Sequence, residues 1–341
     1  MKAMLLHRSS SFEENRSPLE LSNIEIPEPG PGQVLIKVSV CGVCHTELDE
    51  IEGRTAPPKF PVVPGHQVVG RVERNGPGAS NFKTGDRVGV AWIFSACGIC
   101  KYCKAGNENL CDYFRATGRD ANGGYAEFMV AEEKYVYKIP EFFSDAEAAP
   151  MLCAGAIGYR SVRLAGIKDG QRLGFTGFGG SAHLVLKMLR YQFPKVKTYV
   201  FARSESDREF ALELGATWAG DTTDRSPEKL DAIIDTTPAW KPVVEALSNL
   251  EKGGRLVINA IRKEESDKGY LEKLSYQRDL WLEKEIKSVA NVTAKDVKGF
   301  LKLAAEARIK PEFQEYKLEE ANKALLEMKT QKIRGAKVLR V

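Results

Sequence analysis

From Met151 onward, short apolar segments alternate with amphipathic ones, and this pattern constrains the fold more than any other feature of the chain. QRLGFTG is followed by the helical SAHLVLKMLRYQF, KTYVFA by SDREFALELGA, and DAIIDTT by PVVEALSNLE. Strands that alternate with helices of this length are typical of βαβ units around a parallel sheet. The middle of the chain is therefore predicted to be an α/β domain.

The residues before Pro150 follow a different pattern. Segments such as QVLIKVSV, HQVVGRVERNG and DRVGVAW are short, apolar and separated by Gly, Pro and Asn. This punctuation favours a β-rich domain of barrel type. After Asn291, a predicted helix, AKDVKGFLKLAAEARI, leads to a polar stretch and a last strand, GAKVLRV. A length of 341 residues also suggests two domains of about 100 to 200 residues each.

Charge and hydropathy narrow the class of protein. Fifty basic and 46 acidic side chains give a net charge of +4, so charge alone does not favour a nucleic-acid partner. The N-terminus lacks the apolar core of a signal peptide, and no stretch approaches the roughly 18 apolar residues of a membrane span. We expect a soluble cytoplasmic protein with no membrane or nucleic-acid partner, in which clustered cysteines are more often metal ligands or catalysts than disulfides.

Four of the seven cysteines fall within fifteen residues, CGICKYCKAGNENLC. They are Cys97, Cys100, Cys103 and Cys111. A short loop with this spacing can close four thiolates around zinc, and a saturated metal has no open position for a substrate. The cluster is therefore predicted to be a structural zinc site. An iron–sulfur cluster or a nucleic-acid-binding knuckle would be the alternatives, although the loop offers few side chains for phosphate or base contacts.

The remaining cysteines suggest a second metal site. Cys41 and Cys44 lie in CGVCHTE, Cys153 lies in LCAGAIGYR, and His66 lies between them in PGHQVVG. Two thiolates and one imidazole from distant segments, plus a water, form the pattern of a catalytic zinc. Taken singly, each of these residues has a simpler interpretation as a buried packing group.

The segment LGFTGFGGSAHL indicates a dinucleotide. Gly177, Gly179 and Ala182 form a G-x-G-x-x-A fingerprint, and Gly180 and Ser181 lie within it. Its glycines allow a tight turn and close approach of backbone N–H groups to a pyrophosphate at a helix N-terminus. The motif is weak alone, but it gains weight here because it follows a predicted strand and precedes a predicted helix.

These motifs together resemble those of a known family. CGVCHTELD, PVVPGHQVVG, GDRVGV, CGICKYCKAGNENLC, GGYAEF, LCAGAIGYR and GFTGFGGSA stand in the order found in the zinc-dependent alcohol dehydrogenases of the medium-chain dehydrogenase/reductase superfamily. The resemblance spans essentially the whole chain. It implies a GroES-like β-rich catalytic domain from residues 1–153 completed by 294–341, a doubly wound Rossmann cofactor domain from 154–293, and an active site in the cleft.

The resemblance also implies an activity. That activity is reversible hydride transfer between an alcohol and NADP(H) or NAD(H), giving an aldehyde or ketone, with two zinc ions per chain in a homotetramer or homodimer. A zinc-independent quinone or enoyl reductase of the same superfamily, and a nonenzymatic zinc-binding protein, are the alternatives. The first would not need Cys44, His66 and Cys153 together. The second would leave the dinucleotide motif without a purpose.

Individual roles follow from the same resemblance. Cys44, His66 and Cys153 correspond to the catalytic zinc ligands, and Cys41 to a packing residue. Thr46 stands where the family has the hydroxyl that takes the proton of the alcohol, and Asp49 stands where many members have a histidine at the end of the proton relay.

Three further positions complete this comparison. Trp92 matches a position that lines the substrate pocket. Gln67 replaces the usual glutamate after the zinc histidine, and Glu47 replaces a usual aspartate. The departures at Gln67, Glu47 and Asp49 put the rate and the pH profile in question rather than the reaction class.

The second strand of the α/β domain points to the cofactor. The resemblance places Ala202 where an NAD enzyme has an acidic residue for the ribose hydroxyls. Arg203 and Ser204 follow, and with Arg208 they offer cationic and hydroxyl donors to a 2′-phosphate. We therefore favour NADP(H), with NAD(H) as the alternative. His45 and Arg334 are expected near the cofactor pyrophosphate.

Overall fold

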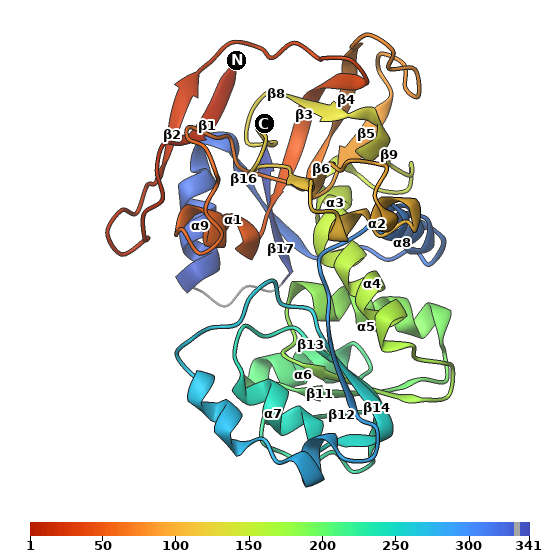
Figure 1. Ribbon diagram of the computed structural model, residues 1–341. Coiled ribbons are helices and arrows are strands. Elements are labelled where there is room, and N and C mark those ends of the chain that lie inside the picture. Colours follow the sequence, from red (N-terminus) through yellow and green to blue (C-terminus); the bar gives the residue numbers. More distant parts are fainter. Residues whose placement is uncertain (331–334) are drawn as a thin grey trace. The chain divides into compact units, whose positions relative to one another are not determined.

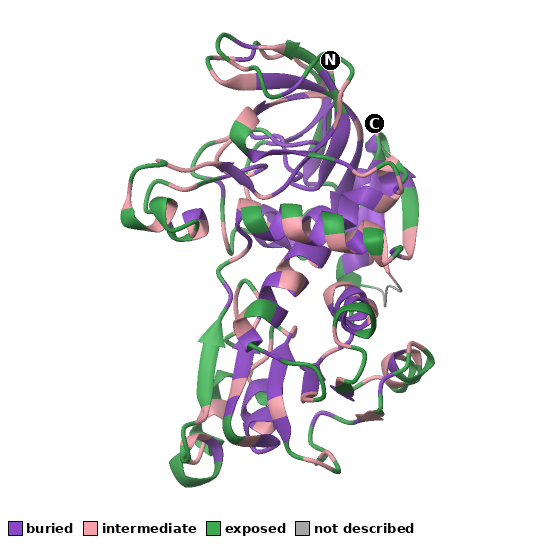
Figure 2. Ribbon diagram, turned by 90° about the vertical axis from the view of Figure 1, so that its right-hand side faces the viewer, coloured by how far each residue is buried: buried purple, intermediate pink, exposed green. Residues whose placement is uncertain are grey.

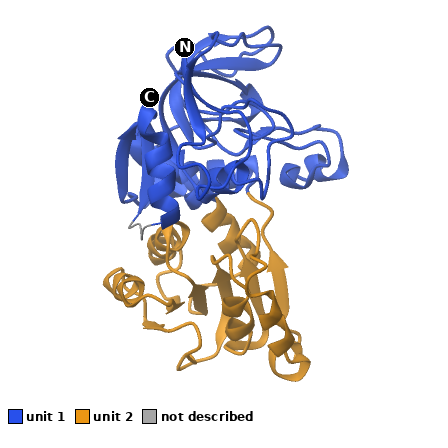
Figure 3. Ribbon diagram, turned by 90° about the vertical axis from the view of Figure 1, so that its left-hand side faces the viewer, with its two compact units in different colours: residues 1–156, 292–341 blue, residues 157–291 orange. Residues whose placement is uncertain are grey.

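The chain divides into two compact units, and each takes up its own part of the sequence. A computed structural model describes residues 1–330 and 335–341. Residues 1–156 and 292–341 form the first unit, and residues 157–291 form the second (Figures 1 and 3). The first unit is thus built from both ends of the chain.

The first unit contains a seven-stranded sheet with the order β16-β17-β3-β4-β5-β9, in which β8 also pairs with β3. All of its pairings are antiparallel except β16 with β17. Its strands are β3 (Gln33–Val43), β4 (Val68–Asn75), β5 (Arg87–Val90), β8 (Phe128–Glu132), β9 (Val136–Lys138), β16 (Phe313–Lys317) and β17 (Ala336–Arg340). Two smaller sheets pair β1 (Lys2–Leu6) with β2 (Leu19–Asn23) and β6 (Ile93–Ser95) with β7 (Arg115–Ala116). Short, Gly- and Pro-punctuated strands thus form the expected β-rich unit, and much of its sheet is buried (Figure 2).

The helices of the first unit lie between and after these strands. They are α1 (His45–Ile51), α2 (Lys101–Lys104), α3 (Asp145–Pro150), α8 (Ala294–Glu306) and α9 (Ala321–Thr330), with a π-helical turn, η3, over Met151–Gly155 and a 3-10 turn, η1, over Glu108–Leu110. The stretch after α8, expected to be merely polar, instead contains β16 and α9. Its apolar residues Ala321, Ala324, Leu325 and Met328 recur at helical spacing and are buried, which gives α9 the one-sided apolar face of a packed helix.

The second unit is a six-stranded parallel sheet with helices, which confirms the predicted α/β fold. Its strand order, β12-β11-β10-β13-β14-β15, is that of a doubly wound dinucleotide-binding sheet. The strands are β10 (Arg172–Thr176), β11 (Lys197–Phe201), β12 (Trp218–Gly220), β13 (Leu230–Asp235), β14 (Leu250–Ile258) and β15 (Glu285–Ser288). The helices are α5 (Gly180–Gln192), α6 (Glu205–Glu213) and α7 (Lys241–Leu247), and α4 (Ala156–Ala165) leads into the unit. None of the helices within the described ranges has the length and hydropathy needed to cross a bilayer.

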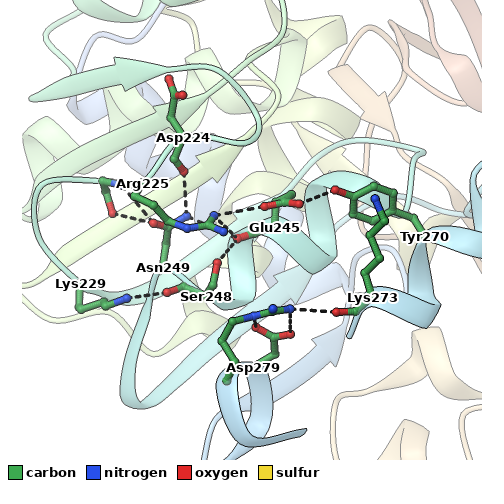
Figure 4. Close-up of polar contacts among 11 residues, drawn as sticks. Asp224, Arg225, Lys229, Glu245, Ser248, Asn249, Tyr270, Lys273 and Asp279 are labelled. Carbon is green, nitrogen blue, oxygen red and sulfur yellow. Dashed lines mark hydrogen bonds and ion pairs between the residues drawn. The ribbon is translucent and has the colours of Figure 1, made fainter. Parts of the chain in front are cut away.

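A polar network holds the long connection between β14 and β15 against α7 (Figure 4). The hydroxyl of Tyr270 donates to the Glu245 carboxylate, and Nη1 of Arg225 lies 3.2 Å from Oε2 of the same side chain. Asp267 accepts hydrogen bonds from the backbone N–H groups of Trp240 and Lys241, at the start of α7. A carboxylate at a helix N-terminus is favourable because the first N–H groups of a helix have no partner within it.

Candidate active site

The structure brings Cys44, His66 and Cys153 together within the first unit. Cys44 is the residue before α1, His66 precedes β4, and Cys153 lies in the η3 turn. The Sγ atoms of Cys44 and Cys153 are 3.9 Å apart, and the three candidate ligand atoms all lie within 4.8 Å of one another. Three segments that are distant in sequence therefore converge on one point.

Glu47 orients the imidazole of His66. Its Oε1 lies 2.5 Å from Nδ1 of His66, and its Oε2 accepts the backbone N–H of Cys44 at 2.8 Å. Both side chains are almost fully buried. Nδ1 must carry a proton to donate to this carboxylate, so the neutral imidazole presents the lone pair of Nε2, and Nε2 is buried with no hydrogen-bond partner within residues 1–330 and 335–341. A carboxylate on one imidazole nitrogen that leaves the other free is the usual support of a metal-bound histidine.

The electrostatics of the site favour a thiolate at Cys44, whereas the hydrogen bond to Cys44 raises the pKa of the Cys153 thiol. A hydrogen bond from Cys153, aided by the neighbouring His66, lowers the pKa of the Cys44 thiol against the opposing effect of burial. A thiolate is the form that binds a metal. Two thiolates and one imidazole leave one position open on a tetrahedral zinc, so the residues present fit a catalytic zinc.

Helix α1 also carries the two predicted relay residues. Thr46 is buried, and its Oγ1 lies 3.6 Å from Sγ of Cys44. Asp49 is one turn further on, where it accepts a hydrogen bond from Nε of Arg54 at 2.6 Å. The sequence analysis missed this ion pair, although an arginine that follows the Gly53 turn after a short helix is a signal that can be searched for.

The predicted pocket residue Trp92 lies in an aromatic and cationic cluster. Its ring is 5.0 Å from that of Phe114, and the guanidinium of Arg119 lies 5.8 Å from its centroid. The sequence analysis also missed Glu50, which is 1% exposed and whose two carboxylate oxygens have no hydrogen-bond partner in the part of the chain that the structure describes. Burial and the charge of Glu47 raise the pKa of this carboxyl group well above its ordinary value, against the opposing charges of His66 and Arg119.

Two other residues near the three-ligand site are packing groups. Cys41 is fully buried, as expected from the resemblance. Gln67 is buried too, and its side chain lies against Gly42, where an added Cβ would be 2.8 Å from Oε1. The glycine therefore makes room for the glutamine.

The four clustered cysteines form a second candidate metal site, in a lobe that we define as residues 97–111. The Sγ atoms of Cys97, Cys100, Cys103 and Cys111 lie within 4.8 Å of one another. Backbone N–H groups of Ile99 and Cys100 lower the pKa of the Cys97 thiol to about 6. Four converging sulfur atoms fit a saturated tetrahedral zinc. All seven cysteines are free of disulfides.

The glycine-rich loop of the second unit joins β10 to α5. Gly177 adopts a φ of +76°, which a residue with a side chain rarely adopts, and an added Cβ would lie 2.9 Å from Oγ1 of Thr236. Gly179 is the residue before α5, and an added Cβ there would meet nothing within 4 Å. Gly180, Ser181 and Ala182 form the first turn of the helix, whose N-terminal N–H groups suit a pyrophosphate.

The end of β11 carries the residues expected at the adenosine. Ala202 is buried and Arg203 is exposed. Ser204 precedes α6, and its hydroxyl lies 2.7 Å from that of Ser206. Arg208 donates through Nη1 to the carbonyls of Ala202 and Arg203, at 2.7 and 3.1 Å, so it braces the loop. Of the two expected pyrophosphate residues, His45 is exposed and Arg334 lies outside the described residues.

A β-rich unit with a three-ligand candidate metal site, whose two sequence segments flank a dinucleotide-binding sheet, is the arrangement expected of a metal-dependent dehydrogenase. Residues 30–141 match the family model of the alcohol dehydrogenase GroES-like domain. The chain is 42% identical over 327 residues to a probable alcohol dehydrogenase AdhA of Mycobacterium tuberculosis, across 94% of this chain and 92% of the relative. It is 33% identical to an alcohol dehydrogenase of Geobacillus stearothermophilus over 98% of this chain and 99% of that one.

The solved structures agree. A cinnamyl alcohol dehydrogenase from Sorghum bicolor superimposes with a TM-score of 0.82 at 26% identity, covering 99% of this chain and 97% of the other. The chain belongs to the alcohol dehydrogenase family of the medium-chain dehydrogenase/reductase superfamily. The resemblance inferred from the sequence is thereby confirmed.

Proposed function

We propose that the chain catalyses the reversible oxidation of an alcohol to an aldehyde or ketone, with zinc at Cys44, His66 and Cys153 and with NADP(H) as the hydride carrier. Membership of its family makes the chain an oxidoreductase that acts on alcohols. The observation that carries the proposal is the convergence of two thiols and one oriented imidazole beside the buried hydroxyl of Thr46.

The residues around the three ligands have separate proposed roles. Zinc, when bound, would act as a Lewis acid that polarises the alcohol oxygen and lowers its pKa. Glu47 holds His66 in the tautomer that presents Nε2 to the metal. The 97–111 lobe would hold a second zinc in a structural role, since its four thiols leave no position open.

A proton must leave the alcohol oxygen when the alcohol is oxidised. Thr46 is the hydroxyl next to Cys44, so we assign it the first proton transfer. Asp49 lies one turn further along α1 and is the proposed acceptor at the end of the relay. Its carboxylate accepts a hydrogen bond from Nε of Arg54 at 2.6 Å, which fixes its position at the end of the proposed relay.

The cofactor is assigned to the second unit. The backbone of Gly177, Gly179, Gly180, Ser181 and Ala182 would hold the pyrophosphate, helped by His45 and Arg334. Arg203 and Ser204 would bind a 2′-phosphate, and Arg208 would fix their loop through its bonds to backbone carbonyls. An exposed arginine after a strand that ends without an acidic residue favours NADP(H) over NAD(H).

Steady-state kinetics with a panel of primary, secondary and aromatic alcohols test the reaction, with NADP(H) and NAD(H) compared in parallel. We expect turnover with a preference for NADP(H), and a lower preference in Arg203→Ser. The control is Arg8→Ser, which removes an exposed arginine of the first unit. It should leave the cofactor preference unchanged. A strong preference of the wild type for NAD(H) would refute the assignment of Arg203.

Metal analysis tests the two zinc sites. The wild type should hold two zinc ions per chain, and Cys153→Ala should hold one and lose activity. A single zinc in an active wild type would contradict the catalytic assignment.

We also propose a homotetramer, or failing that a homodimer, in the cytoplasm. All four residues of β15, among them Ile286, are exposed at one end of the strand order, and the exposed apolar side chains of Trp281 and Leu282 precede them in the chain. An uncovered edge strand invites pairing with a second copy. Seven free thiols suit a reducing compartment. Light scattering on the purified chain distinguishes the assemblies, and a monomer would refute both.

A further inference from the structure

We propose that the 97–111 lobe positions the metal ligand Cys153, and that it does so through Glu108 and helix α8. The proposal rests on the proposed function only in taking Cys153 as a metal ligand. The lobe contains none of the three converging residues of the candidate active site, so its influence must pass through intermediate contacts within the first unit.

The first contact joins the lobe to α8. Glu108 lies in the η1 turn between Cys103 and Cys111, and its Oε1 accepts the backbone N–H of Ala294 at 2.7 Å. Ala294 is the first residue of α8, whose N-terminal N–H groups have no partner within the helix. Glu108 is 8% exposed, so water competes little for this charge-assisted hydrogen bond.

The hydrogen bond from Ala294 to Glu108 lies beside a hollow between the lobe and α8. A hollow of about 560 Å³ lies between the two elements, with Cys103 and Gly106 on the lobe side and Lys298 and Lys302 on the helix side. Where a hollow separates two elements, side-chain packing contributes little to their alignment. The Glu108 carboxylate therefore bridges lobe and helix beside a gap.

The second contact joins α8 to the turn that carries Cys153. Phe300 is fully buried on the inner face of α8 and lies against Gly155, where an added Cβ would be 2.0 Å from Cε1 of the ring. Gly155 closes the η3 turn, two residues after Cys153. Because close-packed groups transmit displacement, a shift of α8 along its axis moves the ring and with it the turn.

The geometry of the η3 turn is sensitive to the position of α8. It follows Pro150, and it is π-helical over Met151–Gly155. A π-helical turn departs from the regular hydrogen bonding of an α-helix, so its geometry depends more on its neighbours. Phe300 is one of these neighbours, and a fixed ring there holds Cys153 at its 3.9 Å separation from Cys44.

Metal release and hydrogen exchange test the proposal without measuring turnover. The variants are Glu108→Ala, Glu108→Gln and, as a matched control, Asp112→Ala, an exposed acidic residue directly after the lobe. Zinc release from the purified holoprotein to a chromogenic chelator is followed in time. The phase that is absent in Cys153→Ala identifies the Cys153 site.

In Glu108→Ala we expect zinc to leave the Cys153 site about tenfold faster, which is the lower end of the usual effect of removing a group that orients a metal ligand. Hydrogen exchange should rise over residues 294–304 and 151–156. Glu108→Gln still offers an amide oxygen to Ala294 and should stay within about threefold of wild type. Asp112→Ala should match wild type. Unchanged release from the Cys153 site in Glu108→Ala would overturn the proposal, and so would equal acceleration in Asp112→Ala.

Phe300→Leu tests the second contact if Glu108→Ala fails to fold. It should speed release from the Cys153 site and leave hydrogen exchange of residues 97–111 unchanged. Wild-type release in this variant would refute the route through α8. Absence of alcohol oxidation in the wild type would instead count against the proposed function, because none of these measurements depends on turnover.

Discussion

The two hydrogen bonds that Glu47 accepts make Glu47→Gln the most informative single substitution. Both groups that face its carboxylate are donors: Nδ1–H of His66 at 2.5 Å and the backbone N–H of Cys44 at 2.8 Å. A glutamine has only one acceptor oxygen, and its NH₂ group must face the other donor. The glutamine can escape this conflict only if His66 moves its proton from Nδ1 to Nε2.

The clash of two donors in Glu47→Gln therefore destabilises the metal-bound state. Without metal, the second tautomer removes the clash at the glutamine, because the glutamine amide donates to Nδ1 and accepts from Cys44, and it leaves only the Nε2–H of His66 without a partner among the described residues. Metal binding requires a free Nε2 and restores the clash of two donors. A buried unsatisfied donor costs about 1 to 3 kcal/mol, and each 1.4 kcal/mol or so is tenfold in affinity. The dissociation constant of the catalytic metal should rise by about 10- to 100-fold.

Chelator competition measures this constant directly. Glu52→Gln is the matched control, because Glu52 follows the same helix and its side chain is only 4% exposed, but it contacts Arg54 and Lys329 rather than His66. It should leave the constant within about twofold of wild type, since it leaves both of the conflicting donors untouched. The tautomer argument is refuted if Glu47→Gln binds metal as tightly as wild type, or if Glu52→Gln loses as much affinity.

Three further predictions concern the lobe, a glycine and the last helix. Cys103→Ser should lower the melting temperature and remove one zinc, whereas Cys44→Ser should lose turnover in a chain that still folds; equal unfolding of both would contradict the division of the two sites. Gly65→Ala should lower the free energy of unfolding, measured by urea denaturation, by about 3 kcal/mol or more through overpacking and backbone strain. The φ of Gly65 is +99°, and an added Cβ would lie 2.4 Å from the Tyr125 ring. A loss below about 1 kcal/mol would show that Tyr125 moves aside. Hydrogen bonds from Lys337 and Tyr316 hold the pKa of Glu327 below its ordinary 4.5, so the stability it contributes is present above that value and is lost as pH falls through the lower, folded pKa. Glu327→Gln should flatten the acid side of the stability profile, and an unchanged slope would exclude this ion pair as its source.

Local patterns in the sequence predict much of the fold. The order β10, Gly177, α5 follows from a strand, a glycine and a helical period that are adjacent in the chain. The spacing of the clustered cysteines likewise predicts that their sulfur atoms converge, because a short loop has few ways to close. Helix α9 could have been predicted in the same way, because Ala321, Leu325 and Met328 recur at helical spacing. The charged residues between them obscure this apolar pattern.

Contacts between distant segments leave no such local signal. Glu108 and Ala294 are 186 residues apart in sequence, and nothing near either residue specifies the partner. The same is true of Phe300 against Gly155. The ion pair of Asp49 with Arg54 is close in sequence, but its geometry depends on how the chain turns after α1. Such contacts depend on the tertiary packing, and they are the ones that orient the candidate site.

The pairing of β17 with β3 has a consequence for the order in which the chain folds as it is made. Val338 and Leu339 lie opposite Gly42 and Cys41, immediately before the first candidate ligand, Cys44. All three candidate ligands have been synthesised once residue 153 is added, yet β17, which pairs with the segment before the first of them, is made only after the whole second unit. The second unit can fold on its own as it emerges, while the sheet of the first unit keeps an open edge at β3 until β17 has been made. A chain that stalls before residue 336 should therefore carry a folded second unit and an unfinished metal centre.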